Sequence, residues 1–143
     1  MPGRVLALDP GKRRIGLAIS DELGLTAQGL PTLVRKSRSH DFEALRRTIA
    51  ERQVKLVIVG NPLHMSGESG RQSQEAVRFA RSVAKHCDLK VELWDERLTT
   101  REATHVLRQS GMGIEKRKVV VDRLAATLIL QSYLDYAANG DPP

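Results

Sequence analysis

The chain has 143 residues, enough for one domain with a buried core, and carries a formal net charge of +6. This charge favours a polyanionic partner such as nucleic acid. No stretch is long and apolar enough to predict a membrane span, and the N-terminus shows no apolar signal region, so we expect a cytoplasmic protein.

The first third of the chain predicts three strands. Arg4–Leu8 and Ile15–Ile19 are short apolar runs separated by Pro10 and Gly11, which form turns, and this spacing suits a hairpin. We expect a third strand at about Leu30–Val34.

Helices and strands then alternate. Phe42, Leu45 and Ile49 recur at three and four residues, which predicts a helix with Ser39 or Asp41 as its N-cap. Lys55–Val59 is typical of a buried central strand. The remaining predicted elements are a polar loop from Gly60 to Gly70, a helix carrying Ala76 to Ala84, a strand at Val91–Trp94, a helix opened by Thr99 that ends near Gly111, a basic loop from Gly111 to Lys118, and a last helix that begins near Asp122.

This order of elements predicts one α/β domain over residues 1–138, followed by a frayed tail at 139–143. Three opening strands followed by alternating helices and strands imply a mixed five-stranded sheet with helices on both faces. No internal repeat or interdomain linker is present in the sequence.

Acidic residues stand at the borders of three predicted elements. Asp9 follows the first strand, Asp95 and Glu96 follow the last strand, and Asp122 opens the last helix. Each has a structural explanation when taken singly: a turn residue, a partner for a neighbouring arginine, or a helix N-cap. Active sites of α/β sheets gather at strand ends, however, and acids brought together there repel one another unless a cation lies between them.

A divalent cation suits such a group of carboxylates. Mg²⁺ and Mn²⁺ prefer carboxylate oxygens and water, and a pair of such ions about 4 Å apart can activate a water and stabilise the leaving oxygen of a phosphodiester. We expect the basic side chains near these acids to hold the nucleic-acid backbone: Lys12, Arg13, Arg14, Arg97, Lys116, Arg117 and Lys118.

Other motifs for chemistry are missing from the sequence. Gly11-Lys12 is not a Walker A loop, because the earlier glycine is absent and Arg13 follows the lysine. The four histidines and the single cysteine, Cys87, lack zinc-ligand spacing. We expect Cys87 to be a partly buried residue at a helix end.

Four short motifs stand in order along nearly the whole chain: Leu8–Ala18, Val59–Leu63, Asp95–Thr100 and Asp122–Ala126. This set resembles the YqgF/RuvX family of Holliday-junction-resolvase-like proteins, which are also regarded as candidate nucleases for pre-16S rRNA.

The resemblance implies a ribonuclease-H-like fold and phosphodiester hydrolysis, with the 5′ end of the 16S rRNA precursor as the target. It also implies that Asp9, Glu96 and Asp122 form the catalytic acidic cluster and bind Mg²⁺ or Mn²⁺. Our leading hypothesis adds that Asp9 bridges the ions. The sequence departs from the family pattern at Asn61, His64 and Ser66, and has Ala125 where true resolvases carry a further acid.

Three other functions stay open at this point. A Holliday-junction resolvase acting on branched DNA would need paired active sites, which a monomer does not provide. The sequence leaves open whether the protein is a monomer or a homodimer. A non-catalytic ribosome-assembly module would bind nucleic acid without cutting it, although clustered acids do not help to bind phosphate. Asp9-Pro10-Gly11 also resembles the first phosphate loop of actin-like ATPases and sugar kinases, but those enzymes need two such domains to enclose a nucleotide.

Overall fold

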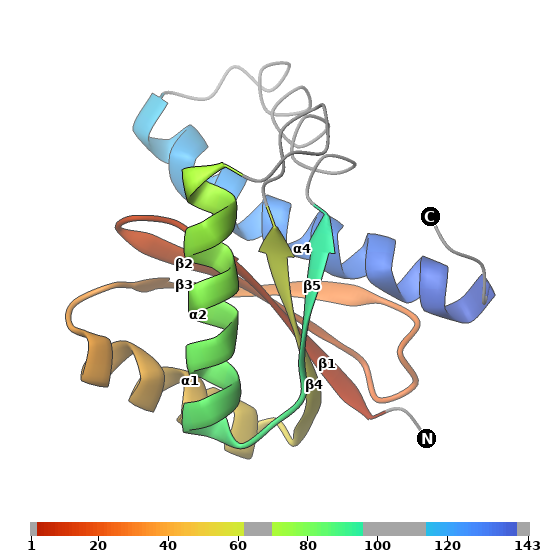
Figure 1. Ribbon diagram of the computed structural model, residues 1–143. Helices are drawn as coiled ribbons and strands as arrows, with labels where there is room; N and C mark the ends of the chain where they lie inside the picture. Colours follow the sequence, from red (N-terminus) through yellow and green to blue (C-terminus); the bar gives the residue numbers. More distant parts are fainter. Residues whose placement is uncertain (1–2, 62–69, 96–113, 140–143) are drawn as a thin grey trace.

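The computed structural model describes residues 3–61, 70–95 and 114–139, and for 114–123 the backbone alone (Figure 1). Within these residues a five-stranded sheet has the order β3-β2-β1-β4-β5. Its strands are β1 (Arg4–Pro10), β2 (Arg14–Ser20), β3 (Ala27–Val34), β4 (Val54–Asn61) and β5 (Val91–Asp95). The β1–β2 and β2–β3 pairs are antiparallel, whereas β1–β4 and β4–β5 are parallel. The predicted mixed sheet is therefore confirmed.

Helices cover both faces of this sheet, as predicted (Figure 1). Helices α1 (Arg38–Glu51) and α2 (Arg71–Cys87) lie on one face, and α4 (Ile114–Asn139) crosses the other. Because side chains alternate along a strand, Leu6 and Leu8 of β1 join the core under α1 and α2, while Val5 and Ala7 join the core under α4.

Small side chains line the contact between α4 and the centre of the sheet. Ala7 of β1 pairs in register with Ala18 of β2, and both belong with Ala126 of α4 to one fully buried cluster. Since alanine adds only a methyl group to the interface, the helix axis can lie close to the strands at this point.

The last helix begins earlier than predicted. It starts at Ile114 rather than near Asp122, so the expected loop at Gly111–Lys118 is wrong over residues 114–118, and Asp122 lies inside the helix instead of capping it. Residues 115–118 (Glu-Lys-Arg-Lys) are good helix formers, and neither Gly nor Pro follows Gly113 until Gly140. The charge of this segment suggested a loop, but its helix propensity determines its structure.

The N-cap of α1 also differs from the prediction. Ser37 is the cap, and its hydroxyl oxygen accepts a hydrogen bond from the backbone N–H of His40 at 3.1 Å. Ser39 and Asp41, the predicted candidates, lie in the first turn of the helix.

The other predicted strands and helices agree with the structure to within a few residues, the largest shift being β3, which begins at Ala27. Cys87 is partly buried at the end of α2, as predicted. The predicted helix from Thr99 lies outside the described residues, and so does the tail except Asn139, the last residue of α4. Among the described helices, none combines the length and hydropathy that a membrane crossing requires.

Candidate functional site

Three parallel strands end at the same edge of the sheet. In the register of β1, β4 and β5, Leu8 pairs with Val59 and Asn61 pairs with Asp95. Asp9, which follows Leu8 and is partly buried, therefore lies at the edge where β4 and β5 also end. The sheet thus places the first predicted acid at the same edge as the end of β5, with β4 between the two strands.

Strand alternation decides which face of the sheet each residue at this edge occupies. Asp9 follows Val5 and Ala7 at intervals of two residues, so it lies on the α4 face. Trp94 belongs to the same α4-side core, whereas its neighbour Asp95 is on the opposite side of the strand. Of the acids that end β1 and β5, Asp9 is the one on the α4 face.

Helix α4 runs from this edge toward the far end of the sheet. The Gln131 side chain accepts from the backbone N–H of Ala27 and donates to the carbonyl of Leu25, both at 3.1 Å. Ala27 pairs with Ser20, whose hydroxyl oxygen accepts from the N–H of Val5 near the start of β1. The later half of α4 therefore lies near the start of β1, and its earlier residues lie toward the edge where β1 ends.

The spacing along β1 and along α4 is similar. Asp9 is two strand residues beyond Ala7, about 6.6 Å. The backbone of residue 122 is four helical residues before Ala126, about 6 Å. Both displacements start from the same buried cluster and lead toward the carboxyl edge, so we expect the backbone of residue 122 to lie near Asp9.

A tight turn connects β1 to β2 directly after Asp9. The N–H of Gly11 donates to the carbonyl of Arg14 at 2.8 Å, and a Cβ at position 11 would lie 2.9 Å from that same oxygen. Only glycine fits here without displacing the backbone. Arg35, between β3 and α1, donates from Nη1 to the Gly11 carbonyl at 2.7 Å and from its N–H to the Arg13 carbonyl at 2.8 Å. The turn after Asp9 is therefore anchored to the segment before α1.

Arg35 is itself held by a buried carboxylate. Asp41 is only 4% exposed, and its Oδ2 lies 3.5 Å from Arg35 Nε. Its Oδ1 accepts from the N–H of Lys36 at 3.0 Å and lies 3.1 Å from His40 Nδ1. Burial alone would raise the pKa of Asp41, but its contacts with His40, Lys36 and Arg35 outweigh burial and lower that pKa below its usual value.

A groove of about 910 Å³ opens from this turn across the α1–α2 side of the molecule. The Asp9–Lys12 turn, the Arg35–Ser37 segment, the first turns of α1 and one side of α2 line it. Its basic side chains are Lys12, Arg35, Lys36, Arg38 and Arg78, and its acids are Asp9, Asp41 and Glu75. The sequence analysis missed most of these residues, although three basic residues within Arg35–Arg38 were a visible signal.

Aromatic residues connect the end of β5 to the later half of α4. The Trp94 ring packs against Tyr133 with ring centroids 5.6 Å apart and against Tyr136 at 5.5 Å. Burial, and then the nearby Glu92 carboxylate, raise the pKa of Tyr133, so its phenol stays protonated at neutral pH. The buried Trp94 Nε1 has no hydrogen-bond partner among the described residues.

The structure describes part of the predicted site. Lys12 and Arg13 are exposed in the turn after Asp9, and Arg14 begins β2. Glu96, Arg97, His64 and Ser66 lie outside the described residues. The side chains of Lys116, Arg117, Lys118 and Asp122 are not described either, and the described side chains contain no group of three His, Cys, Asp or Glu suited to a metal ion. The acidic cluster therefore stays a prediction.

Two of the departures from the family pattern are described. Asn61, at the end of β4, accepts a hydrogen bond from the buried Ser73 hydroxyl at 2.6 Å, which ties the end of the strand to the first turn of α2. Ala125 is buried on α4. Neither residue supplies a carboxylate to the edge of the sheet.

Comparison with known proteins identifies relatives over nearly the whole chain. The RuvX family model, described as Holliday junction resolvase, matches residues 3–136. Two curated relatives carry the name "Putative pre-16S rRNA nuclease". The one from Koribacter versatilis is 51% identical over 133 residues, which is 93% of this chain and 87% of the relative. The one from Syntrophus aciditrophicus is 48% identical over 132 residues, which is 92% of this chain and 88% of the relative.

Solved structures share the fold at much lower identity. RuvC of Thermus thermophilus, in complex with a Holliday junction substrate, matches with a TM-score of 0.58 and 16% identity over 96% of both chains. The Fowlpox virus resolvase, in complex with Holliday junction DNA, matches with a TM-score of 0.54 and 12% identity over 94% of this chain and 98% of the other. These similarities confirm the predicted ribonuclease-H-like fold.

Proposed function

Because the chain belongs to the YqgF/RuvX family, we propose that it is a divalent-metal-dependent nuclease that processes the 5′ end of pre-16S rRNA. The names of the relatives and the resolvase-like fold support a nuclease. Since the proposed substrate is a precursor of ribosomal RNA, we propose that the protein acts in the cytoplasm.

One observation supports this proposal: β1 and the earlier half of α4 lead to the same edge of the sheet. Asp9 lies there on the α4 face, and α4 brings residue 122 toward the same edge. Glu96 is two residues after Trp94, which is on the α4 face of β5. We assign Asp9, Glu96 and Asp122 to the catalytic cluster because the described parts of β1, β5 and α4 lead toward this edge, and because the family resemblance implies the same three acids.

Carboxylates suit Mg²⁺ or Mn²⁺, which are hard ions that bind oxygen. When bound, such an ion polarises the scissile phosphate and lowers the pKa of a water. The protein's own part is to fix Asp9 through the turn that Arg35 anchors, and to hold the substrate backbone. The proposed backbone contacts are Lys12, Arg13, Arg14, Arg97, Lys116, Arg117 and Lys118.

A cleavage assay with Asp9→Asn tests the assignment. The wild-type protein, Asp9→Asn and the matched control Asp88→Asn are incubated with precursor 16S rRNA, a four-way DNA junction and an unstructured RNA. Each reaction contains Mg²⁺, Mn²⁺ or EDTA. Asp88 is exposed after α2 and before β5 begins, so it lies at the end of the strands opposite the proposed cluster. We expect precursor cleavage with metal, no cleavage in EDTA, loss in Asp9→Asn and retention in Asp88→Asn.

Glu96→Gln and Asp122→Asn extend the test to residues whose side chains are not described. Both variants should lose cleavage as Asp9→Asn does while unfolding at the same urea concentration as the wild type. Preferred cutting of the four-way junction by a dimer would instead indicate a resolvase. Binding without cleavage in every metal would refute the nuclease proposal and favour a non-catalytic assembly module.

A further inference from the structure

The groove on the α1–α2 side has an excess of positive charge. Arg35 and Asp41 pair with each other within its wall, which leaves Lys12, Lys36, Arg38 and Arg78 against Asp9 and Glu75. Lys12, Lys36 and Arg78 are exposed and form no ion pair with any described residue. A groove with this charge suits a polyanion.

The floor of the groove favours contact with phosphates over contact with bases. Phe42 and Phe79 lie there but are 5% and 8% exposed. The Arg38 guanidinium covers the Phe42 ring at 5.3 Å, and Arg35 covers the Phe79 ring at 5.5 Å. Because a guanidinium already covers each of these two rings, neither ring is available to stack on a base. Recognition in the groove would therefore be independent of the base sequence.

The length of the groove corresponds to a few nucleotides. Both Gln72 and Ser82 of α2 line it, and ten residues of helix extend about 15 Å. A wall of this length is enough for a few successive phosphates of one strand. Arg38 is fixed at one end by a hydrogen bond of 3.0 Å from its Nη2 to the Ser82 hydroxyl oxygen, and Asp9 lies at the other end.

We propose that this groove binds the sugar-phosphate backbone of one substrate strand where that strand leaves the acidic edge, with Lys12, Lys36, Arg38 and Arg78 as the phosphate contacts. The proposal rests on the nuclease function proposed above and adds a binding path on the side of Asp9 opposite α4. It assigns the groove to a phosphodiester chain, RNA or DNA.

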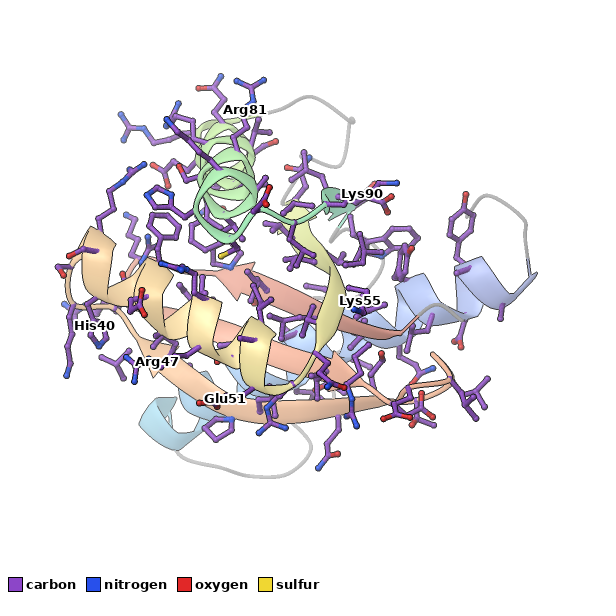
Figure 2. The ribbon with its side chains drawn as sticks, turned by 90° about the horizontal axis from the view of Figure 1, so that it is seen from below. His40, Arg47, Glu51, Lys55, Arg81 and Lys90 are labelled. Atoms are coloured by element: carbon purple, nitrogen blue, oxygen red, sulfur yellow. The ribbon has the colours of Figure 1, made fainter. Side chains whose placement is uncertain are left out.

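Binding measured in EDTA tests the groove separately from cleavage. The double variant Lys36→Ala/Arg78→Ala is compared with the control Lys55→Ala/Arg81→Ala. The control removes the same charges at exposed positions that do not line the groove; Figure 2 shows Arg81 on the side of α2 away from the sheet and Lys55 beside β4. Fluorescence anisotropy then gives the affinity for labelled single-stranded RNA, single-stranded DNA and duplexes of two unrelated sequences across a range of salt concentrations.

Each lost phosphate contact should weaken binding at 0.1 M salt by about fivefold for single strands and about eightfold for duplexes, and should reduce the slope of log K against log[salt] by about 0.7 or 0.9 respectively. In the groove variant, which loses two contacts, we expect twice that change in slope, and the same change for both sequences. In the control variant the slope should stay close to that of the wild type, apart from any long-range effect of the two lost charges. Equal losses of affinity for RNA and for DNA would support a contact with the backbone. The variant Arg78→Lys keeps the positive charge and should retain most of the affinity.

Several results would overturn the groove proposal. They are equal loss in groove and control variants, loss confined to one base sequence, or wild-type binding in the groove variant. If Asp9→Asn abolishes cleavage while the groove variant binds normally, only the groove proposal fails. If no metal supports cleavage but the groove variant loses binding, the nuclease proposal fails and the groove assignment stands.

Discussion

Replacing Asp41 by asparagine should destabilise the protein by removing one buried negative charge. The asparagine side chain can still accept the hydrogen bond from the Lys36 N–H, but its amide would face the Arg35 guanidinium, donor against donor. Hydrogen bonds to a charged group contribute roughly 1.5–3 kcal/mol each. The side chains of Arg35 and His40 are 33% and 36% exposed, so solvent screens both contacts. We expect a net loss of about 2 kcal/mol, or a fall in Tm of about 6 °C.

This loss should depend on pH. The pKa of Asp41 is lowered in the folded state, so its contribution is fully present above the unfolded value of about 3.9 and is lost as pH falls through the folded value. Urea unfolding of wild type and Asp41→Asn between pH 7 and pH 3 should show a gap in unfolding free energy that narrows below about pH 4.

Asp88→Asn is the matched control, because Asp88 is exposed and asparagine also tolerates its left-handed backbone, with φ of 50°. It should change stability by less than about 0.5 kcal/mol. A gap for Asp41→Asn that stays constant with pH, or one as small as that of the control at pH 7, would refute the role given to this carboxylate.

Three further substitutions test the elements that position the site. Ser37→Ala removes the N-cap of α1 and should cost about 1 kcal/mol in urea unfolding; an unchanged midpoint would contradict the cap. Gly11→Ala places a Cβ against the Arg14 carbonyl and should reduce cleavage roughly tenfold to a hundredfold, with wild-type rates arguing against a role for the turn. Ala126→Leu should destabilise by about 1–3 kcal/mol by forcing α4 off the sheet, and equal stability would show a looser contact.

The sequence predicted those parts of the fold whose signals are local. Apolar runs such as Lys55–Val59 have few alternatives to a central strand, and the spacing of Phe42, Leu45 and Ile49 fits only a helix. Asp9 could be located for the same reason, since Pro10 and Gly11 mark the end of its strand. The predicted start of α4 is too late because the high charge of residues 115–118 suggests a loop, although Glu, Lys and Arg are good helix formers.

The groove could not be predicted in this way, because it depends on contacts between distant segments. Arg78 is near Lys12 only because α2 packs over the parallel strands that place the β1 turn at the same edge. Asp41 looked like an ordinary helix-start acid, and its burial follows from the Arg35 side chain folding back over it. Neither relation leaves a pattern at fixed sequence spacing.

The alanines of α4 connect the fold to the proposed chemistry. Ala126 is fully buried against Ala7 and Ala18, so the depth at which α4 lies on the sheet is set by three small side chains. That depth also determines how closely residue 122, one turn earlier, approaches Asp9. Ala125 is likewise buried and adds no carboxylate, so Asp122 is the acid that the sequence provides in this turn of α4. A variant that lifts α4 should therefore lose metal-dependent cleavage more steeply than stability, because carboxylates that share an ion tolerate little separation.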